Sequence, residues 1–263
     1  MTNIAAVSSS RPVALITGAS AGIGFAFAQA LAERGYDLIV TARRRERLEE
    51  LAAGLRAKHA GIRVEIIVAD LAGAAAPEQI AAEIARLGMD VELLVNNAGF
   101  GTHGRFESIA PAREQEEIAL NVAALVALTH AFLPAMLERG HGGVINIAST
   151  AAFQPVPWMS VYGASKAFVR SFSEALHEEV HARGVRVLAL CPGPTATEFF
   201  DTAVAPPRGP IRTVRDVVAT GLRAYEKGAP VAIDGPSNQI MIRLASLMPR
   251  RWTTKIAGRI MHP

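Results

Sequence analysis

Apolar residues follow two spacings along this chain, and the two spacings alternate. Short runs rich in β-branched residues predict strands at Val13–Thr17, Asp37–Ala42, Val64–Val68, Val91–Val95, Gly143–Ala148, Val185–Leu190 and Val231–Ile233. Between them, apolar residues at helical spacing predict helices at Ile23–Arg34, Arg45–His59, Glu78–Leu87, Ala112–Arg139, Ser160–Arg183 and Val217–Tyr225. This alternation is typical of βαβ crossovers, so we predict a doubly wound α/β fold with about seven parallel strands and helices on both faces.

The alternation continues without a linker, a composition shift or an internal repeat, so we expect residues 1–263 to form a single domain. Three stretches of this domain depart from the pattern, the third being the C-terminal tail. Residues 1–11 predict a flexible N-terminus. Residues 192–212 are rich in proline and predict a long loop, of the kind that often covers a substrate as a lid.

The C-terminal tail, residues 236–263, mixes two kinds of side chain at helical spacing. Its apolar residues include Leu244, Trp252 and Ile256, and its basic residues include Arg243 and Arg250. We favour a helical pair that packs on the domain or on a neighbouring subunit. The alternative is contact with an anionic membrane surface.

Composition narrows the classes of function. Half of the 263 residues are hydrophobic and 19% are charged, which is enough apolar material for a core and excludes general disorder. A net charge of +3, without a basic stripe that interleaves aromatic residues, argues against a nucleic-acid partner. The single cysteine, Cys191, excludes an internal disulfide framework and a cysteine-based metal site. We expect no metal.

The same sequence indicates a compartment. Met1–Arg11 lacks the basic and apolar regions of a signal peptide. No run approaches the roughly 18 apolar residues that span a bilayer. A lone thiol fits a reducing environment, so we expect a cytoplasmic protein.

A glycine-rich turn follows the first predicted strand. Thr17–Gly24 has the spacing Gly-x-x-x-Gly-x-Gly. Glycines allow a tight turn, and the helix that begins there offers unpaired N–H groups and the positive end of its dipole. Glycine-rich turns also occur for packing reasons, but this position favours a site for the pyrophosphate of a dinucleotide.

The end of the second strand indicates which dinucleotide. An NAD site usually has an acidic residue there, whereas this chain has Arg43 and Arg44. Two guanidinium groups suit a 2′-phosphate, so we hypothesise NADP(H); the alternative is a solvated helix start. Further along, Asp70 ends the third strand, where its carboxylate can accept a bond from an adenine amino group, and Asn96–Gly99 ends the fourth.

Tyr162 and Lys166 lie four positions apart on a predicted helix and therefore share one face. A phenol has a pKa of about 10, and lowering it to about 7 takes roughly 4 kcal/mol, which a nearby ammonium group helps to supply. Ser149 ends the fifth strand, where its hydroxyl can bond to a substrate carbonyl. Asn121 is unusual inside a helix; we expect it to bend the helix or to hold a water molecule.

These motifs occur in the order found in short-chain dehydrogenases/reductases of about 250 residues, and the sequence resembles that family from residue 17 to residue 197. The resemblance implies a Rossmann-type fold and an oxidoreductase acting on CH–OH groups. Tyr162 would be the general acid in reduction and the base in oxidation. Lys166 would bind the nicotinamide ribose and lower the Tyr162 pKa, Ser149 would orient the substrate oxygen, and Asn121 would hold a water in a proton relay.

The resemblance also implies a cofactor site and an assembly. The cofactor contacts would come from Gly18, Ser20, Ala21, Gly22, Ile23, Gly24, Arg43, Arg44, Asp70, Leu71, Asn97, Ala98, Gly99, Tyr162, Lys166, Pro192, Gly193, Thr195 and Thr197. Many NADP-preferring relatives have a basic residue inside the glycine turn, where this chain has Ala21, so the NADP(H) preference rests on Arg43 and Arg44. The two long helices imply a homodimer or homotetramer.

The segments flanking the catalytic positions supply aromatic side chains for a substrate wall. Phe153, Trp158, Phe199 and Phe200 predict an apolar pocket, although several of them could instead pack the lid. The leading function is therefore a carbonyl reductase that interconverts a carbonyl and a secondary alcohol on an apolar small molecule. The alternative is a catalytically silent NADP(H)-binding sensor or interaction protein of the same fold.

Overall fold

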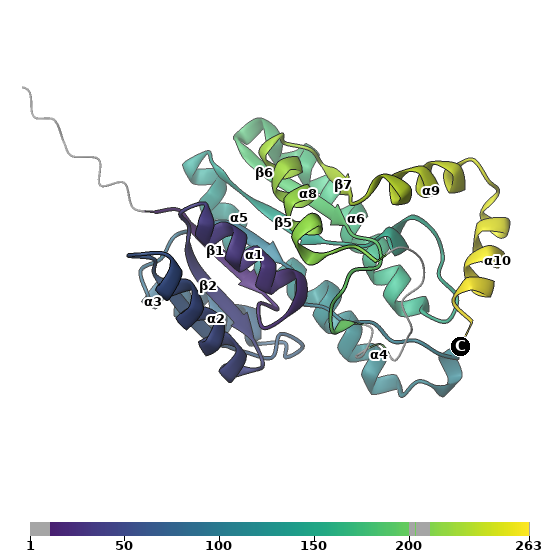
Figure 1. Cartoon of the computed structure of the whole chain (residues 1–263), viewed down its shortest axis with the longest axis horizontal. Helices are drawn as coiled ribbons and strands as arrows, with labels where there is room; N and C mark the ends of the chain where they lie inside the picture. Colours follow the sequence, from purple (N-terminus) through teal and green to yellow (C-terminus); the bar gives the residue numbers. More distant parts are fainter. Residues whose placement is uncertain (1–10, 200–202, 204–210, 263) are drawn as a thin grey trace, which may run out of the picture.

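Seven parallel strands form one sheet in the order β3-β2-β1-β4-β5-β6-β7 (Figure 1). The computed structural model describes residues 11–199, 203 and 211–262. The strands are β1 Val13–Thr17, β2 Asp37–Ala42, β3 Val64–Val68, β4 Val91–Asn96, β5 Gly142–Ile147, β6 Val185–Cys191 and β7 Val231–Ile233. The chain leaves β1 toward β2 and β3 and returns past β1 to β4, so the strand order reverses between β1 and β4. Such a reversal leaves a crevice at the carboxyl ends of the strands.

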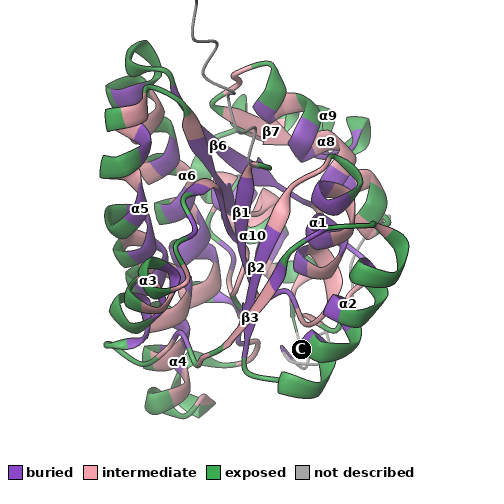
Figure 2. Cartoon of the chain, turned by 90° about the vertical axis from the view of Figure 1, so that its left-hand side faces the viewer, coloured by how far each residue is buried: buried purple, intermediate pink, exposed green. Residues whose placement is uncertain are grey.

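Helices cover both faces of the sheet (Figure 2). One face carries α1 Gly22–Glu33, α2 Arg45–Lys58 and α8 Val214–Glu226, and the other carries α3 Ala76–Arg86, α4 Pro111–Ile118, α5 Leu125–Arg139 and α6 Ser160–Val180. Each layer has its own cluster of buried apolar residues. The predicted doubly wound α/β fold is therefore confirmed.

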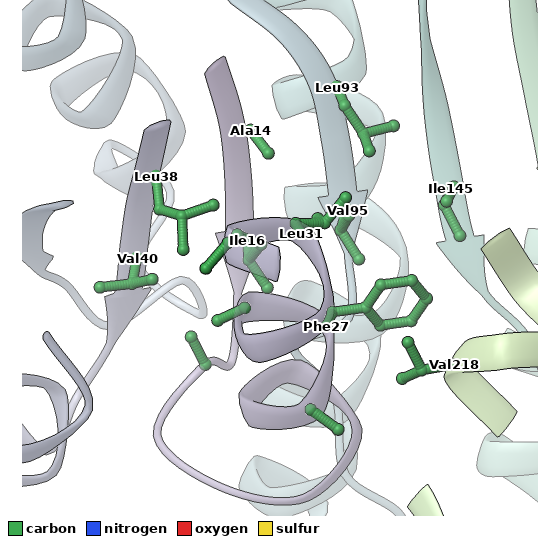
Figure 3. Close-up of a cluster of buried hydrophobic side chains, with 14 of the residues drawn as sticks. Ala14, Ile16, Phe27, Leu31, Leu38, Val40, Leu93, Val95, Ile145 and Val218 are labelled. Atoms are coloured by element: carbon green, nitrogen blue, oxygen red, sulfur yellow. The ribbon is translucent and has the colours of Figure 1, made fainter. Parts of the chain in front are cut away.

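The core under α1 fixes the position of the glycine turn. Phe27 and Leu31 are almost fully buried and pack toward Ile16 of β1 and Val95 of β4 (Figure 3). Burying a side chain of this size contributes about 1.5–3 kcal/mol. Because α1 is held in this way along its length, its first turn is kept against the carboxyl end of β1.

The predicted strands are confirmed to within one residue at each end. Continuous β-branched runs mark them because parallel strands are covered on both faces. The predicted helices are confirmed as well, with ends that differ by up to three residues. The helix expected at 112–139 is interrupted by a π-helical turn at Ala119–Ala124, and the one expected at 160–183 ends in a 3₁₀ turn at His181–Arg183.

The long helix Pro111–Arg139 is apolar and long enough to cross a membrane by length and composition. This corrects the expectation that no segment approaches such a length. One side of this helix faces the sheet, however, and Leu125, Leu128, Phe132 and Met136 are buried there. A core helix of an α/β protein meets the same criterion, so the helix belongs to the core.

The tail folds as the expected helical pair, α9 Pro236–Ser246 and α10 Arg250–Ile260. Both lie at the end of the molecule opposite α1, α2 and α3 (Figure 1). The segment expected to form the lid is described only in part: Thr195 forms a bridge with Arg212, and most of the intervening segment, which includes Phe200, lies outside the described residues.

Candidate active site

A cleft of about 570 Å³ lies at the carboxyl ends of the strands. It runs from the glycine turn and the ends of β2 and β3, past β5 and α6, to the tail helices. The predicted cofactor residues that line it are Gly18, Ser20, Ala21, Gly22, Ile23, Arg43, Arg44, Asp70, Leu71, Asn97, Gly99, Tyr162, Lys166, Pro192, Gly193, Thr195 and Thr197. Motifs spread over 180 residues of sequence therefore meet in one cleft.

The glycine turn needs its glycines for two different reasons. Gly18 and Gly22 have φ values of +64° and +57°, which side-chain-bearing residues rarely adopt. Gly24 instead serves packing, because a Cβ there would lie 2.5 Å from Asn97 Nδ2. Gly24 does not line the cleft. Because it has no side chain, the first turn of α1 can lie close to Asn97, at the end of β4.

Thr17 and Asn97 hold this turn to the end of β4. The Thr17 hydroxyl accepts bonds from the backbone N–H groups of Asn97 and Ala98, both at 2.9 Å. Asn97 Nδ2 donates to the Thr17 carbonyl at 2.8 Å. Ala98 does not line the cleft; its contribution is this backbone bond. The turn is thus preorganised, with the N-terminus of α1 facing the cleft, and an anionic pyrophosphate fits there.

The two arginines lie at one end of the cleft and are about half exposed. Arg44 bonds to the Ser20 hydroxyl at 3.2 Å and pairs with Glu198 at 2.8 Å. Arg43 is 3.5 Å from Glu116. Exposed ion pairs of this kind contribute little stability, and a phosphate dianion offers each guanidinium group a stronger partner.

Asp70 closes the same end of the cleft from β3. Its Oδ1 accepts a bond from the Ala72 N–H at 3.1 Å, which fixes the carboxylate where the strand ends. Leu71 beside it is buried and lines the cleft. Both residues thus line the cleft where the third strand ends.

Ser149, Tyr162 and Lys166 come together in the middle of the cleft. The Ser149 hydroxyl lies near enough to the Tyr162 phenol to influence its pKa. Lys166 Nζ lies 5.9 Å from the centre of the Tyr162 ring and donates to the Ile147 carbonyl at 2.8 Å. Since the three groups come from the end of β5 and from one face of α6, the sheet and helix fix their relative positions.

Burial dominates the electrostatics of this group. It raises the pKa of Tyr162 to about 12, against the opposing effect of the Ser149 hydroxyl. It lowers the pKa of Lys166 to about 8. The expected lowering of the Tyr162 pKa by Lys166 is therefore not found in the protein alone. Tyr162 is a protonated phenol at neutral pH, which is the state a general acid requires.

Asn121 lies in the π-helical turn, so the expected irregularity of the helix is present. Its Nδ2 donates to the Phe100 carbonyl at 2.8 Å, and its Oδ1 accepts from the Phe100 N–H at 3.1 Å. A Cβ on Gly99 would lie 2.8 Å from Asn121 Oδ1 and 3.4 Å from Lys166 Nζ. Asn121 therefore lies close to Lys166 and holds the chain that follows β4, although it does not line the cleft.

Glu117 is a buried acid that the sequence analysis missed. It lies one helical turn before Asn121 and is fully buried. Its Oε2 accepts bonds from the N–H and the hydroxyl of Thr102 at 2.9 and 2.8 Å, while Oε1 has no hydrogen-bond partner among the described residues. Burial raises its pKa to about 7, and Lys166 opposes that rise. Nothing in the sequence of the acidic segment Arg113–Glu117 distinguishes this carboxyl from those of Glu114 and Glu116.

The far end of the cleft is apolar. Phe199 lies there as expected, with its ring 5.2 Å from that of Tyr162. The sequence analysis missed the contribution of the tail, which was visible only as an amphipathic pattern. The apolar side chains at this end are Phe100, Val156, Met159, Phe199, Met241, Ala257, Ile260 and Met261.

Two predicted wall residues lie elsewhere. The Arg170 guanidinium lies over the Phe153 ring, 4.4 Å from the centre of that ring. Phe153 also packs against the core between β6 and α6. Trp158 has a φ of +70° and turns toward α10, where its Nε1 donates to the Gly258 carbonyl at 2.9 Å. Neither lines the cleft. The sequence placed Phe153 and Trp158 close to Tyr162 but could not show where their side chains point, because tertiary contacts set their orientation.

Comparison with known proteins agrees with this geometry. The family model "short chain dehydrogenase" matches residues 12–207. Sulfoacetaldehyde reductase 2 of Chromohalobacter salexigens is 39% identical over 196 residues, which are 71% of this chain and 74% of that protein. NADP-dependent 3-hydroxy acid dehydrogenase YdfG of Escherichia coli K12 is 39% identical over 189 residues, with the same two shares.

A solved structure extends the similarity beyond the family match. The short-chain dehydrogenase from Sphingobium yanoikuyae in complex with NADPH has a TM-score of 0.80 and 33% identity, and the match covers 94% of this chain and 93% of that one. The chain belongs to the short-chain dehydrogenase family of NAD(P)-dependent oxidoreductases.

Proposed function

We propose that this protein interconverts a carbonyl and a secondary alcohol on an uncharged, apolar small molecule, with NADP(H) as its cofactor. The observation that carries the proposal is the Ser149–Tyr162–Lys166 group, which faces a cleft with a cationic rim at one end and an apolar wall at the other. A dinucleotide fits the first end and an apolar substrate fits the second.

The nicotinamide supplies or accepts the hydride when the cofactor is bound. In reduction, Tyr162 gives its phenolic proton to the carbonyl oxygen as the carbonyl carbon becomes a carbinol. Ser149, which lines the cleft beside Tyr162, orients the same oxygen and stabilises its developing charge. Lys166 is held by the Ile147 carbonyl and binds the nicotinamide ribose. Oxidation uses the same residues in reverse, with Tyr162 as the base.

The NADP(H) preference rests on the end of β2. Arg43 and Arg44 are the cations that line that end of the cleft among the described residues, and their guanidinium groups can bind a 2′-phosphate in a bidentate manner. The YdfG relative is named as NADP-dependent, and the Sphingobium enzyme was solved with NADPH. Both observations support NADP(H).

The apolar end supports a substrate class that differs from those in the relatives' names. Sulfoacetaldehyde and 3-hydroxy acids both carry an acidic group. Lys166 is the sole Lys or Arg near the reacting centre among the described residues that line the cleft. Within the part of the chain that the structure describes, no guanidinium group lines this end of the cleft to pair with a substrate carboxylate or sulfonate, which favours aliphatic, aromatic or steroid-like ketones and alcohols.

Turnover of NADPH with a panel of apolar ketones, aldehydes and 3-oxoacyl thioesters tests the proposal. We expect consumption of NADPH with several neutral compounds and little with sulfoacetaldehyde. Tight NADPH binding without turnover on any compound would instead favour the silent sensor. The complete Ser149, Tyr162, Lys166 and Asn121 set argues against that alternative, because cofactor binding alone does not need all four.

We further infer that the protein is a homodimer or homotetramer. Ile118 of α4 and Phe168 of α6 are exposed on neighbouring helices, and exposed apolar side chains of this size often mark an interface. Light scattering on the purified protein measures the mass directly, and a monomer would contradict this inference.

A further inference from the structure

The tail helices expose an apolar surface. Trp252, Ile256 and Ile260 recur every four residues along α10 and are 55%, 43% and 52% exposed. Residues at this spacing form a stripe along one side of a helix. Leu247, in the connection from α9 to α10, is 82% exposed and extends the surface. We call these four residues and Leu244 the tail face.

A second stripe on α10 is basic. Arg251, Lys255 and Arg259 have the same spacing, each one position before an apolar residue of the tail face, and all three are exposed. Residues 235–263 contain five basic residues and no Asp or Glu, whereas residues 1–234 contain 22 basic and 24 acidic residues. The tail thus has a charge opposite in sign to that of the rest of the chain.

We propose that the tail face docks on the surface of an anionic lipid bilayer. Apolar side chains beside a cationic stripe are the features that bind a helix in the plane of a membrane interface. Anionic headgroups attract each nearby cation, and tryptophan favours the interfacial depth. A second copy of the chain is a poorer occupant, because two-fold contact through this face would bring ten cations together without an acid among them.

The position of α10 supports docking. α10 and the connection from α9 form the outer edge of the molecule, at the right of Figure 1. Thr253 and Ala257 of α10 are buried, Trp158 Nε1 donates to the Gly258 carbonyl, and just after the helix His103 Nε2 bonds to the Met261 carbonyl at 2.7 Å. The outer side is therefore available without unfolding the helix.

The tail face also reaches the mouth of the cleft. Ile260 is exposed and lines the cleft, as does Met241 of α9. A docked molecule would present that mouth to the boundary between headgroups and acyl chains, where apolar compounds concentrate. This route for the substrate rests on the proposed function, whereas docking itself does not.

Flotation of the full-length protein with vesicles tests docking without turnover. The vesicles are pure phosphatidylcholine or phosphatidylcholine mixed with phosphatidylglycerol. We expect binding to the anionic vesicles, which high salt weakens, and little binding to the neutral ones. The double variant Arg251→Gln/Lys255→Gln should bind roughly thirtyfold more weakly, since each cation near the surface contributes on the order of a fivefold gain. The matched control Arg47→Gln/Lys58→Gln, on exposed positions of α2, should bind like the wild type.

A second readout uses the tryptophan. Vesicles of brominated phosphatidylglycerol should quench part of the fluorescence of the wild type, and Trp252→Phe should remove that part. Absence of binding to anionic vesicles would overturn the proposal, as would equal weakening by both double variants. If the wild type does not bind vesicles and the Arg251→Gln/Lys255→Gln variant has a lower oligomer mass than the wild type, the tail face is instead an interface between copies of the chain. None of these results depends on NADPH turnover, so they are distinguishable from failure of the proposed function.

Discussion

At the scale of the residue, the site is governed by burial. Three groups that influence one another here are the Tyr162 phenol with a pKa of about 12, the Lys166 amine with a pKa of about 8 and the Glu117 carboxyl with a pKa of about 7. All three shifts favour the neutral form, as desolvation predicts. Bringing Tyr162 toward the phenolate needed for oxidation therefore requires positive charge beyond that of Lys166, and the oxidised nicotinamide carries such a charge.

Tyr162→Phe removes only the hydroxyl that we propose as the proton donor. We expect turnover to fall by about 10²–10⁴-fold, the usual contribution of a general acid, while NADPH affinity changes little. Initial rates and a fluorescence titration with NADPH measure the two effects. Near-normal turnover in this variant would assign the acid to another residue.

Glu117→Gln tests the buried carboxyl through stability. The folded-state pKa of about 7 lies above the ordinary value of 4.5, so the wild type loses stability as pH rises from about 4.5 to 7. Glutamine keeps an acceptor for Thr102 and cannot ionise. We therefore compare the free energy of unfolding of the variant with that of the wild type at each pH. This difference should favour the variant by up to about 3 kcal/mol more at pH 8 than at pH 5.

Thermal unfolding of both proteins at the two pH values measures this difference. Glu83→Gln is a suitable control, because Glu83 is an acid on the surface of α3 that pairs with Arg86. An equal stability difference at pH 5 and pH 8 would show that the Glu117 carboxyl does not titrate as described.

At the scale of the element, two interruptions of regular structure build the site. The turn between β1 and α1 places backbone N–H groups at the cleft, and the π-helical turn before α5 places Asn121 against Phe100. π-Helical turns often occur at functional sites. The glycine turn was predictable from its spacing, whereas only the unusual asparagine pointed to the π-helical turn.

We assign the cofactor preference to the junction of β2 and α2. The double variant Arg43→Ala/Arg44→Ala should raise the KM for NADPH by at least about tenfold, since bonds to charged groups contribute roughly 1.5–3 kcal/mol each. The KM for NADH should change little, because NADH lacks the 2′-phosphate. Steady-state kinetics with both cofactors measures the effect.

Arg45→Ala/Arg47→Ala is the matched control for charge. These two arginines lie on the first turn of α2 and pair with exposed acids of the same helix. Equal losses for NADPH and NADH in the Arg43/Arg44 variant would contradict the assignment of these residues to the 2′-phosphate.

At the scale of the whole molecule, the sequence predicted the order and extent of the strands and the meeting of distant motifs. Continuous burial makes parallel strands visible as apolar runs, and βαβ topology brings their carboxyl ends to one edge. The features it did not predict depend on tertiary packing. Glu117 is buried by neighbours, Phe153 and Trp158 are turned away by Arg170 and α10, and the tail supplies part of the wall.

The central claim is the reduction of an uncharged, apolar carbonyl compound with NADPH. The most direct test compares a 3-oxo ester with the corresponding free 3-oxo acid at neutral pH, because the two share the carbonyl and differ in the charge. We predict NADPH oxidation with a kcat/KM at least about a hundredfold higher for the ester, as expected when a carboxylate enters an apolar site without a partner. Equal or faster reduction of the free acid would contradict the account.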